Sequence, residues 1–187
     1  MSTLLEQPSL RRQVIPLTVE AYHALGEMGF IEEKSELIHG FIFAKMSKSP
    51  LHFIVCQRLI DCLRSVCGTG LSVRQEQPIT TLDSEPEPDI AVVRGPSESF
   101  AKTHPRTAAL VIEVSVSTLD RDLEKATVYA AAGVEEYWII RPEEAVADVY
   151  TQPGTAGYTT VRRVERDGVL TPAVLPAVSI RMEELLA

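Results

Sequence analysis

The spacing of hydrophobic and polar positions along the 187-residue chain changes several times, and each change predicts a new element. Near the start, Thr18 is a suitable N-cap for a helix from about Val19 to Met28. The run ELIHGFIFAKM is rich in β-forming residues around His39-Gly40, a pattern typical of a hairpin or a bulged strand.

A second helical pattern begins at Pro50 and continues to the glycine at Gly68. Its three cysteines, Cys56, Cys62 and Cys67, have gaps of 6 and 5 residues, which match neither a CxxC zinc motif nor a paired disulfide framework. We therefore expect buried free thiols that serve packing rather than metal binding or redox chemistry.

The period then changes to that of strands, in the runs LSVRQEQPITTL, PDIAVV and AALVIEV. A helix is predicted from Asp120 to Ala132, with Ser117 or Thr118 as its cap and with Leu119 and Leu123 on its apolar face. The strand EEYWII follows at once, and strand, helix and strand in series predict a parallel crossover that places helices over a sheet.

The C-terminal part predicts hairpin strands around Pro153-Gly154 and Asp167-Gly168, followed by a helical turn from Met182 to Leu186. We expect these strands to extend the sheet or to pack beside it. The sequence has no internal repeat and no linker, so we expect one α/β (α+β) domain over residues 1–187, with a mixed β-sheet flanked by helices.

Composition and the lengths of the apolar runs indicate where in the cell the protein is expected. Hydrophobic residues make up 45% of the chain, but no apolar run approaches the roughly 20 residues of a membrane-spanning helix. The segment from Met1 to Pro16 has neither the apolar core nor the cleavage site of a secretory signal, so we expect a cytoplasmic protein without membrane contact.

The formal net charge of −8 weighs against a nucleic-acid partner, because proteins that bind duplexes gain affinity when Lys and Arg displace counterions from phosphates. A metal-dependent nuclease can still be acidic, since bound cations change the local charge and some of the acidic residues are metal ligands. The charge therefore weakens any nucleic-acid hypothesis without excluding it.

Two carboxylates occupy positions where burial is costly. Glu113 lies inside the apolar run AALVIEV, and Asp89 follows Pro88 at the start of another apolar strand. Taken singly, each has an ordinary explanation: Asp89 would cap a turn, and Glu113 would pair with Arg74 or Arg94. Taken together, they indicate a cation between them, because two adjacent carboxylates otherwise repel.

Four further residues have weaker signals. Lys125 lies on the predicted crossover helix, on a flank shared with Tyr129, and its long side chain could reach back toward Glu113. A lysine there is more often a solvated surface charge. Glu36 has the position of a hairpin-edge charge, and His52, near a helix start, is more often a surface or cap residue than a ligand.

These residues, in this order along the chain, resemble the Uma-two family of proposed endonucleases, a branch of the PD-(D/E)XK superfamily. The residues and motifs that carry the resemblance are Glu36 in ELIHG, Pro88-Asp89 in PEPDIAVV, and Glu113-Val114-Ser115 and Lys125 in VIEVSVST…DRDLEKATVYAAAGVEEYWII. The resemblance covers about Thr18 to Arg141 and implies a restriction-endonuclease-like core. Ser115 takes the usual strand position of the motif's lysine, and Lys125 offers the replacement from the helix.

The resemblance also implies roles. Asp89 and Glu113 would hold Mg²⁺ or Mn²⁺, and a backbone carbonyl beside them, that of Val114, would complete the coordination. Lys125 would orient the attacking water or stabilise the developing charge, and Glu36 would assist directly or through water. His52 and Tyr129 are the weakest candidates.

The implied reaction is metal-dependent hydrolysis of phosphodiester bonds in nucleic acid, with DNA as the expected substrate and a homodimer as one possible assembly. Two alternatives stay open. One is a non-catalytic module that keeps the nuclease fold and binds nucleic acid or protein, which the negative net charge favours. The other is a metal-dependent hydrolase of a different phosphate ester.

Overall fold

The computed structural model describes residues 13–31 and 34–187, so most of the N-terminal segment assessed for a secretory signal lies outside the described residues. The elements, in chain order, are α2 (Val19–Glu27), β1 (Ser35–Ile38), β2 (Phe41–Ala44), α3 (Pro50–Val66), β3 (Leu71–Gln75), β4 (Ile90–Arg94), η2 (Ser97–Phe100), β5 (Leu110–Val114), α4 (Leu119–Ala131), β6 (Glu136–Arg141), β7 (Val146–Gly154), β8 (Gly157–Val164), β9 (Val169–Leu170), β10 (Ile180–Arg181) and α5 (Met182–Leu186).

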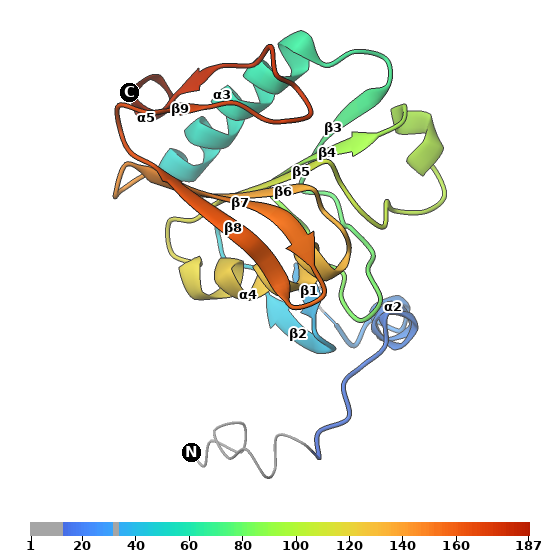
Figure 1. The fold of residues 1–187 in the computed structure, drawn as a ribbon. Helices are drawn as coiled ribbons and strands as arrows, with labels where there is room; N and C mark the ends of the chain where they lie inside the picture. The colour runs from blue at the N-terminus through green and yellow to red at the C-terminus, as the bar shows by residue number, and fades with distance from the viewer. Residues whose placement is uncertain (1–12, 32–33) are drawn as a thin grey trace.

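A six-stranded mixed sheet organises the fold, with the strand order β3-β4-β5-β6-β7-β8. Strands β5 and β6 are parallel and joined through α4, and the other neighbours are antiparallel. Helix α3 and the C-terminal tail cover one face of the sheet, whereas α4 covers the other with the β1–β2 hairpin beside it (Figure 1). The predicted fold class, a mixed sheet flanked by helices, is confirmed.

The β1–β2 hairpin is made possible by its turn. His39 and Gly40 have φ values of 49° and 74°, as a two-residue turn between twisted strands requires. A side chain at Gly40 would collide with Pro16, so glycine is needed there for space as well as for backbone freedom. Backbone hydrogen bonds of 2.7 Å and 3.4 Å join Leu37 to Glu85 and tie β1 to the loop that precedes β4.

Helix α4 presents a different face to the core from the one predicted. Leu123 is 43% exposed, whereas Asp122, Lys125 and Tyr129 are buried. Thr118 stands at the N-cap position, but its hydroxyl donates to the Asp122 carboxylate at 2.7 Å instead of capping the helix. The expected apolar stripe is wrong at Leu123, because the helix turns its polar flank toward the buried carboxylate of β5.

Two strand predictions also need correction. The first long strand ends at Gln75, since Glu76 has a φ of 49° and turns the chain out of the sheet. The expected hairpin around Asp167-Gly168 is absent from the described residues, where β9 pairs with β10 in a separate small sheet. The other hairpin is confirmed, with Gly154 opposite Gly157 at its end.

The cysteines are free thiols, as predicted. Cys56, on α3, is buried in the hydrophobic core. Cys62 and Cys67 are only half-buried, so the prediction of buried thiols was wrong for these two. Within residues 13–31 and 34–187, no helix is both long enough and apolar enough to cross a membrane.

Candidate active site

The register of the sheet places Asp89 opposite Glu113. Strands β4 and β5 are antiparallel and pair Ile90 with Ile112. Asp89 comes just before Ile90 and Glu113 just after Ile112, so the two carboxylates face each other where the ladder ends. The Asp89 N–H donates to Glu113 Oε2 at 3.3 Å. The structure thus brings together the two residues that the sequence singled out.

Glu113 is 3% exposed and has partners from α4 on one of its oxygens. Its Oε1 accepts hydrogen bonds from Lys125 Nζ at 3.0 Å and from the Tyr129 hydroxyl at 3.1 Å. Burial raises the pKa of Glu113, the positive charge of Lys125 opposes this, and the nearby Asp89 carboxylate adds to the rise. The net pKa lies above that of an ordinary glutamate.

Asp89 is 7% exposed and is held from the opposite side. Its Oδ1 pairs with Lys48 Nζ at 2.8 Å, and its Oδ2 accepts from His52 Nε2 at 3.0 Å and from the Val114 N–H at 2.8 Å. Burial raises the pKa of Asp89, but the hydrogen bond from His52 and the charge of Lys48 outweigh it and hold the pKa below its usual value. His52 is therefore buried against Asp89, and its assignment to the surface was wrong.

The ordinary explanation for Glu113, a pair with a nearby arginine, is also wrong. Arg94 pairs with Glu135 at 2.8 Å, and Arg74 lies beside His104 at 3.3 Å. The cation that compensates Glu113 comes from helix α4 instead.

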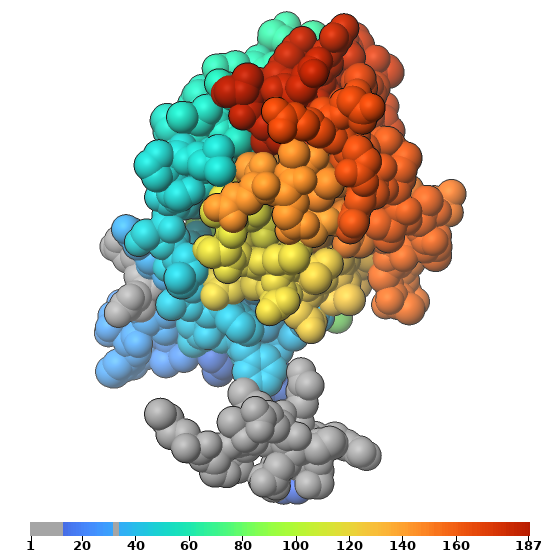
Figure 2. Space-filling view, turned by 90° about the vertical axis from the view of Figure 1, so that its left-hand side faces the viewer, coloured from blue at the N-terminus to red at the C-terminus, as the bar shows by residue number. Residues whose placement is uncertain are grey.

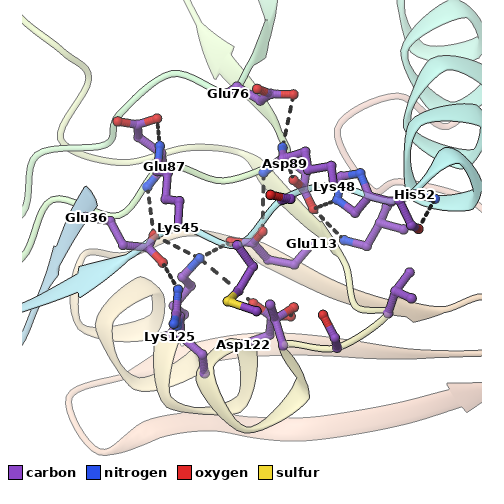
Figure 3. Close-up of a pocket in the computed structure, with 18 residues that line it drawn as sticks. Glu36, Lys45, Lys48, His52, Glu76, Glu87, Asp89, Glu113, Asp122 and Lys125 are labelled. Atoms are coloured by element: carbon purple, nitrogen blue, oxygen red, sulfur yellow. Dashed lines mark hydrogen bonds and ion pairs between the residues drawn. The ribbon is translucent and has the colours of Figure 1, made fainter. Parts of the chain in front are cut away.

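Lys125 is 4% exposed and lies among three carboxylates (Figure 3). Its Nζ is 3.0 Å from Glu36 Oε2, 3.0 Å from Glu113 Oε1 and 3.9 Å from Asp122 Oδ1. Burial alone lowers the pKa of Lys125, but the charges of Glu113 and Glu36 outweigh it and raise the pKa above its usual value. Lys125 is thus a fixed ammonium group, and Glu36 is 3% exposed rather than an edge charge.

One pocket, with a volume of about 120 Å³, is lined by Asp89, Glu113, Lys125, Glu36 and His52, but not by Tyr129. The segment between β2 and α3 and the start of α4 form its walls, and the two lie side by side in the space-filling view, in cyan and in yellow (Figure 2). Six carboxylates and four cationic side chains line it: Glu36, Glu76, Glu87, Asp89, Glu113 and Asp122, with Lys45, Lys48, Arg121 and Lys125. With histidine neutral and every carboxylate ionised, the lining has two more negative than positive charges.

Several lining residues were missed by sequence reasoning. Lys45 pairs with Glu87, and Lys48 bridges Asp89 and Glu76 at 2.8 Å and 3.0 Å. The only sequence signal is the pair of lysines in the segment FAKMSKSP, between a hairpin and a helix, and two lysines in a connecting segment indicate no particular site. The facing carboxylates Asp89 and Glu113, in a pocket with two excess negative charges, fit a divalent cation that prefers oxygen ligands, such as Mg²⁺ or Mn²⁺.

Comparison with known proteins identifies the family of the chain. The family model of Uma2, described as "Putative restriction endonuclease", matches residues 19–183. The chain belongs to the Uma2 family. A crystal structure from Anabaena variabilis ATCC 29413, described as a putative nuclease of DUF820, is similar to this Uma2 protein with a TM-score of 0.78 and 19% identity, over 91% of this chain and 98% of that one. This likeness shows a shared fold. No curated protein matches the sequence of this Uma2 chain.

Proposed function

We propose that this Uma2 protein is a Mg²⁺- or Mn²⁺-dependent endonuclease that hydrolyses phosphodiester bonds of nucleic acid, with DNA as the expected substrate. The observation that carries the proposal is the pair Asp89 and Glu113, facing each other beside the buried ammonium of Lys125. The family description supports the reaction class. A pocket with two excess negative charges is suited to one divalent cation.

Asp89 and Glu113 would hold the ion, with the backbone carbonyl of Val114 beside them, because carboxylate and carbonyl oxygens suit Mg²⁺ and Mn²⁺. When bound, the ion would lower the pKa of a water molecule and offset negative charge on the phosphate under attack. The Tyr129 hydroxyl and the Asp89 N–H fix the orientation of the Glu113 carboxylate from two directions. The ligand pair is thus held in place before any ion arrives.

Lys125 would act as a donor, not as a base. The surrounding carboxylates keep its ammonium protonated, so it can donate a hydrogen bond to the attacking water or to a phosphate oxygen. Glu36 is a positioning residue, because it acts through Lys125 at 3.0 Å and is itself held by the Glu87 N–H at 3.3 Å.

The rim of the pocket has cations that can bind backbone phosphates of a nucleic acid, despite the net charge of −8. Lys45, Lys48 and Arg121 line it, with 25%, 38% and 22% of their side chains exposed. Arg121 also stacks over the Phe43 ring at 5.2 Å, which keeps its guanidinium at the hairpin side of the rim. The net charge describes the whole surface, whereas these three cations lie at the mouth of the pocket, where Lys48 and Lys45 pair with Glu76 and Glu87.

Cleavage assays on plasmid DNA, RNA and nucleotides with Mg²⁺ or Mn²⁺ test the proposal. We expect metal-dependent cleavage of a nucleic acid that a chelator abolishes, and a loss of at least about 100-fold in Asp89→Asn and in Glu113→Gln. Asp61→Asn, which changes an exposed carboxylate on α3, should retain full activity. Cleavage by both site variants at the wild-type rate would contradict the proposal.

The second candidate is a non-catalytic binding module, which the net charge of −8 favours. Folded wild-type protein that binds a nucleic acid or a protein, but cleaves none of these substrates with either metal, would support this candidate instead.

A further inference from the structure

A second set of metal-binding side chains lies behind Asp89. His52 and Cys56 are one turn apart on α3 and share a face. Cys56 Sγ is 3.6 Å from His52 Nδ1 and 3.9 Å from Nε2, and His52 Nε2 is 3.0 Å from Asp89 Oδ2. One ligand atom of each residue lies within 4.8 Å of the other two, and all three residues are buried.

This donor set differs from that of the proposed hydrolytic site. Imidazole, thiolate and carboxylate together are zinc ligands, whereas Mg²⁺ and Mn²⁺ favour oxygen alone. Around a tetrahedral zinc ion, ligand atoms are roughly 3.3–3.8 Å apart, given the usual zinc–ligand bond lengths. The present separations would therefore need shifts of about 1 Å or less.

We propose that His52, Cys56 and Asp89 form a second metal site, selective for Zn²⁺ over Mg²⁺ and Mn²⁺, which inhibits hydrolysis because it takes Asp89 from the first site. Binding of one Zn²⁺ ion would release one proton to solvent. The Cys56 thiol releases its proton to solvent, and the proton that His52 directs at Asp89 moves to Nδ1, which frees Nε2 for the ion. Water would fill the fourth position.

The position of Asp89 explains why the two ions compete. Asp89 lies between Glu113 on one side and His52 on the other (Figure 3). Two divalent ions that share one carboxylate repel each other, and a nitrogen and sulfur site holds Zn²⁺ more tightly than oxygen ligands hold Mn²⁺. The inhibitory effect rests on the proposed nuclease function, but the zinc site itself does not.

Cobalt titration tests the site directly, because Co²⁺ replaces Zn²⁺ and a bound thiolate gives a charge-transfer absorption band in the near ultraviolet. We expect a saturable band with one equivalent of Co²⁺ in the wild type and its loss in Cys56→Ser. Cys62→Ser is the matched control, since Cys62 lies on the same helix but outside the cluster, and it should keep the band. No band in folded wild type, or a band that persists in Cys56→Ser, overturns the proposal.

Two further variants separate this inference from the proposed function. His52→Gln should lose the band as well, which keeps the test valid if Cys56→Ser fails to fold, as judged by the fluorescence of Trp138. Glu113→Gln should keep the band, because Glu113 contributes nothing to the zinc site, whether or not the wild type cleaves nucleic acid. If cleavage is found, Zn²⁺ should inhibit it, with a half-inhibitory concentration at least about tenfold higher in Cys56→Ser than in the wild type. Equal inhibition of both proteins would overturn the inhibitory role alone.

Discussion

At the scale of single residues, the two facing carboxylates have opposite pKa shifts. For Glu113, burial dominates and raises the pKa. For Asp89, burial acts in the same direction, but the hydrogen bond from His52 and the charge of Lys48 reverse the outcome. Asp89 is therefore ionised over the working pH range, whereas Glu113 can retain a proton above the pH at which an exposed glutamate would lose it.

This difference predicts how manganese affinity depends on pH. Below the raised pKa of Glu113 the ion must displace a proton, so affinity should rise up to about tenfold per pH unit and level off above that pKa. Asp89, with its lowered pKa, should contribute no such slope. Calorimetric titrations in two buffers of different ionisation enthalpy would measure the released proton. An affinity that is constant from about pH 5 to pH 8, without proton release, would count against this account.

At the scale of elements, helix α4 is held to the sheet partly by charge. Lys125 compensates Glu36 and Glu113 in a buried environment, and removal of one partner from such a cluster leaves uncompensated carboxylates. The helix therefore owes its orientation to this lysine as well as to apolar packing.

Lys125→Met should accordingly lower the free energy of unfolding by about 3–5 kcal/mol in the presence of a chelator. Mn²⁺ should recover part of this loss, because the ion restores positive charge between the carboxylates. Urea denaturation with and without Mn²⁺ measures both effects, and Lys102→Met on the exposed surface is the matched control. A loss no larger than in the control would show that the cluster does not hold the helix.

Local signals in the sequence were enough to predict most helices and strands, but not which face of each one packs against the core. The turn at His39-Gly40 and the helix that starts at Pro50 follow from nearby residues alone. The inward face of α4 does not, because Lys125 meets Glu36 and Glu113, which are remote in sequence. The same holds for His52, whose partner Asp89 is 37 positions away.

The resemblance to the family predicted more of the site than the residue patterns alone. Asp89, Glu113, Lys125 and Glu36 do meet in one pocket, as the family pattern implied. The contributions of Lys48 and of the other rim cations depend on how the β2–α3 segment crosses the end of the sheet, and no local pattern encodes that path.

At the scale of the whole molecule, a formal net charge of −8 is combined with a pocket whose mouth offers few cations. Only a few phosphate contacts are available in the described part of the pocket, where Lys45, Lys48 and Arg121 are the cations at the mouth. Duplex affinity should therefore depend weakly on salt.

We predict a slope of roughly −3 for the logarithm of the DNA association constant against the logarithm of the salt concentration, from about three phosphate contacts. Fluorescence anisotropy with the cleavage-deficient Asp89→Asn variant and a labelled duplex would give this slope, and Arg121→Met should reduce its magnitude by about one. A slope steeper than about −6 would indicate a larger basic surface elsewhere on the protein.

Calorimetric titration of Mn²⁺ tests, before any substrate is known, whether Asp89 and Glu113 together bind a divalent cation. The wild type and the Asp89→Asn/Glu113→Gln double variant, both first shown to be folded, would be titrated under identical conditions. We predict saturable binding of Mn²⁺ to the wild type and none to the double variant. Equal binding to both proteins, or no saturable binding to the wild type, would contradict the metal site and the nuclease mechanism built on it.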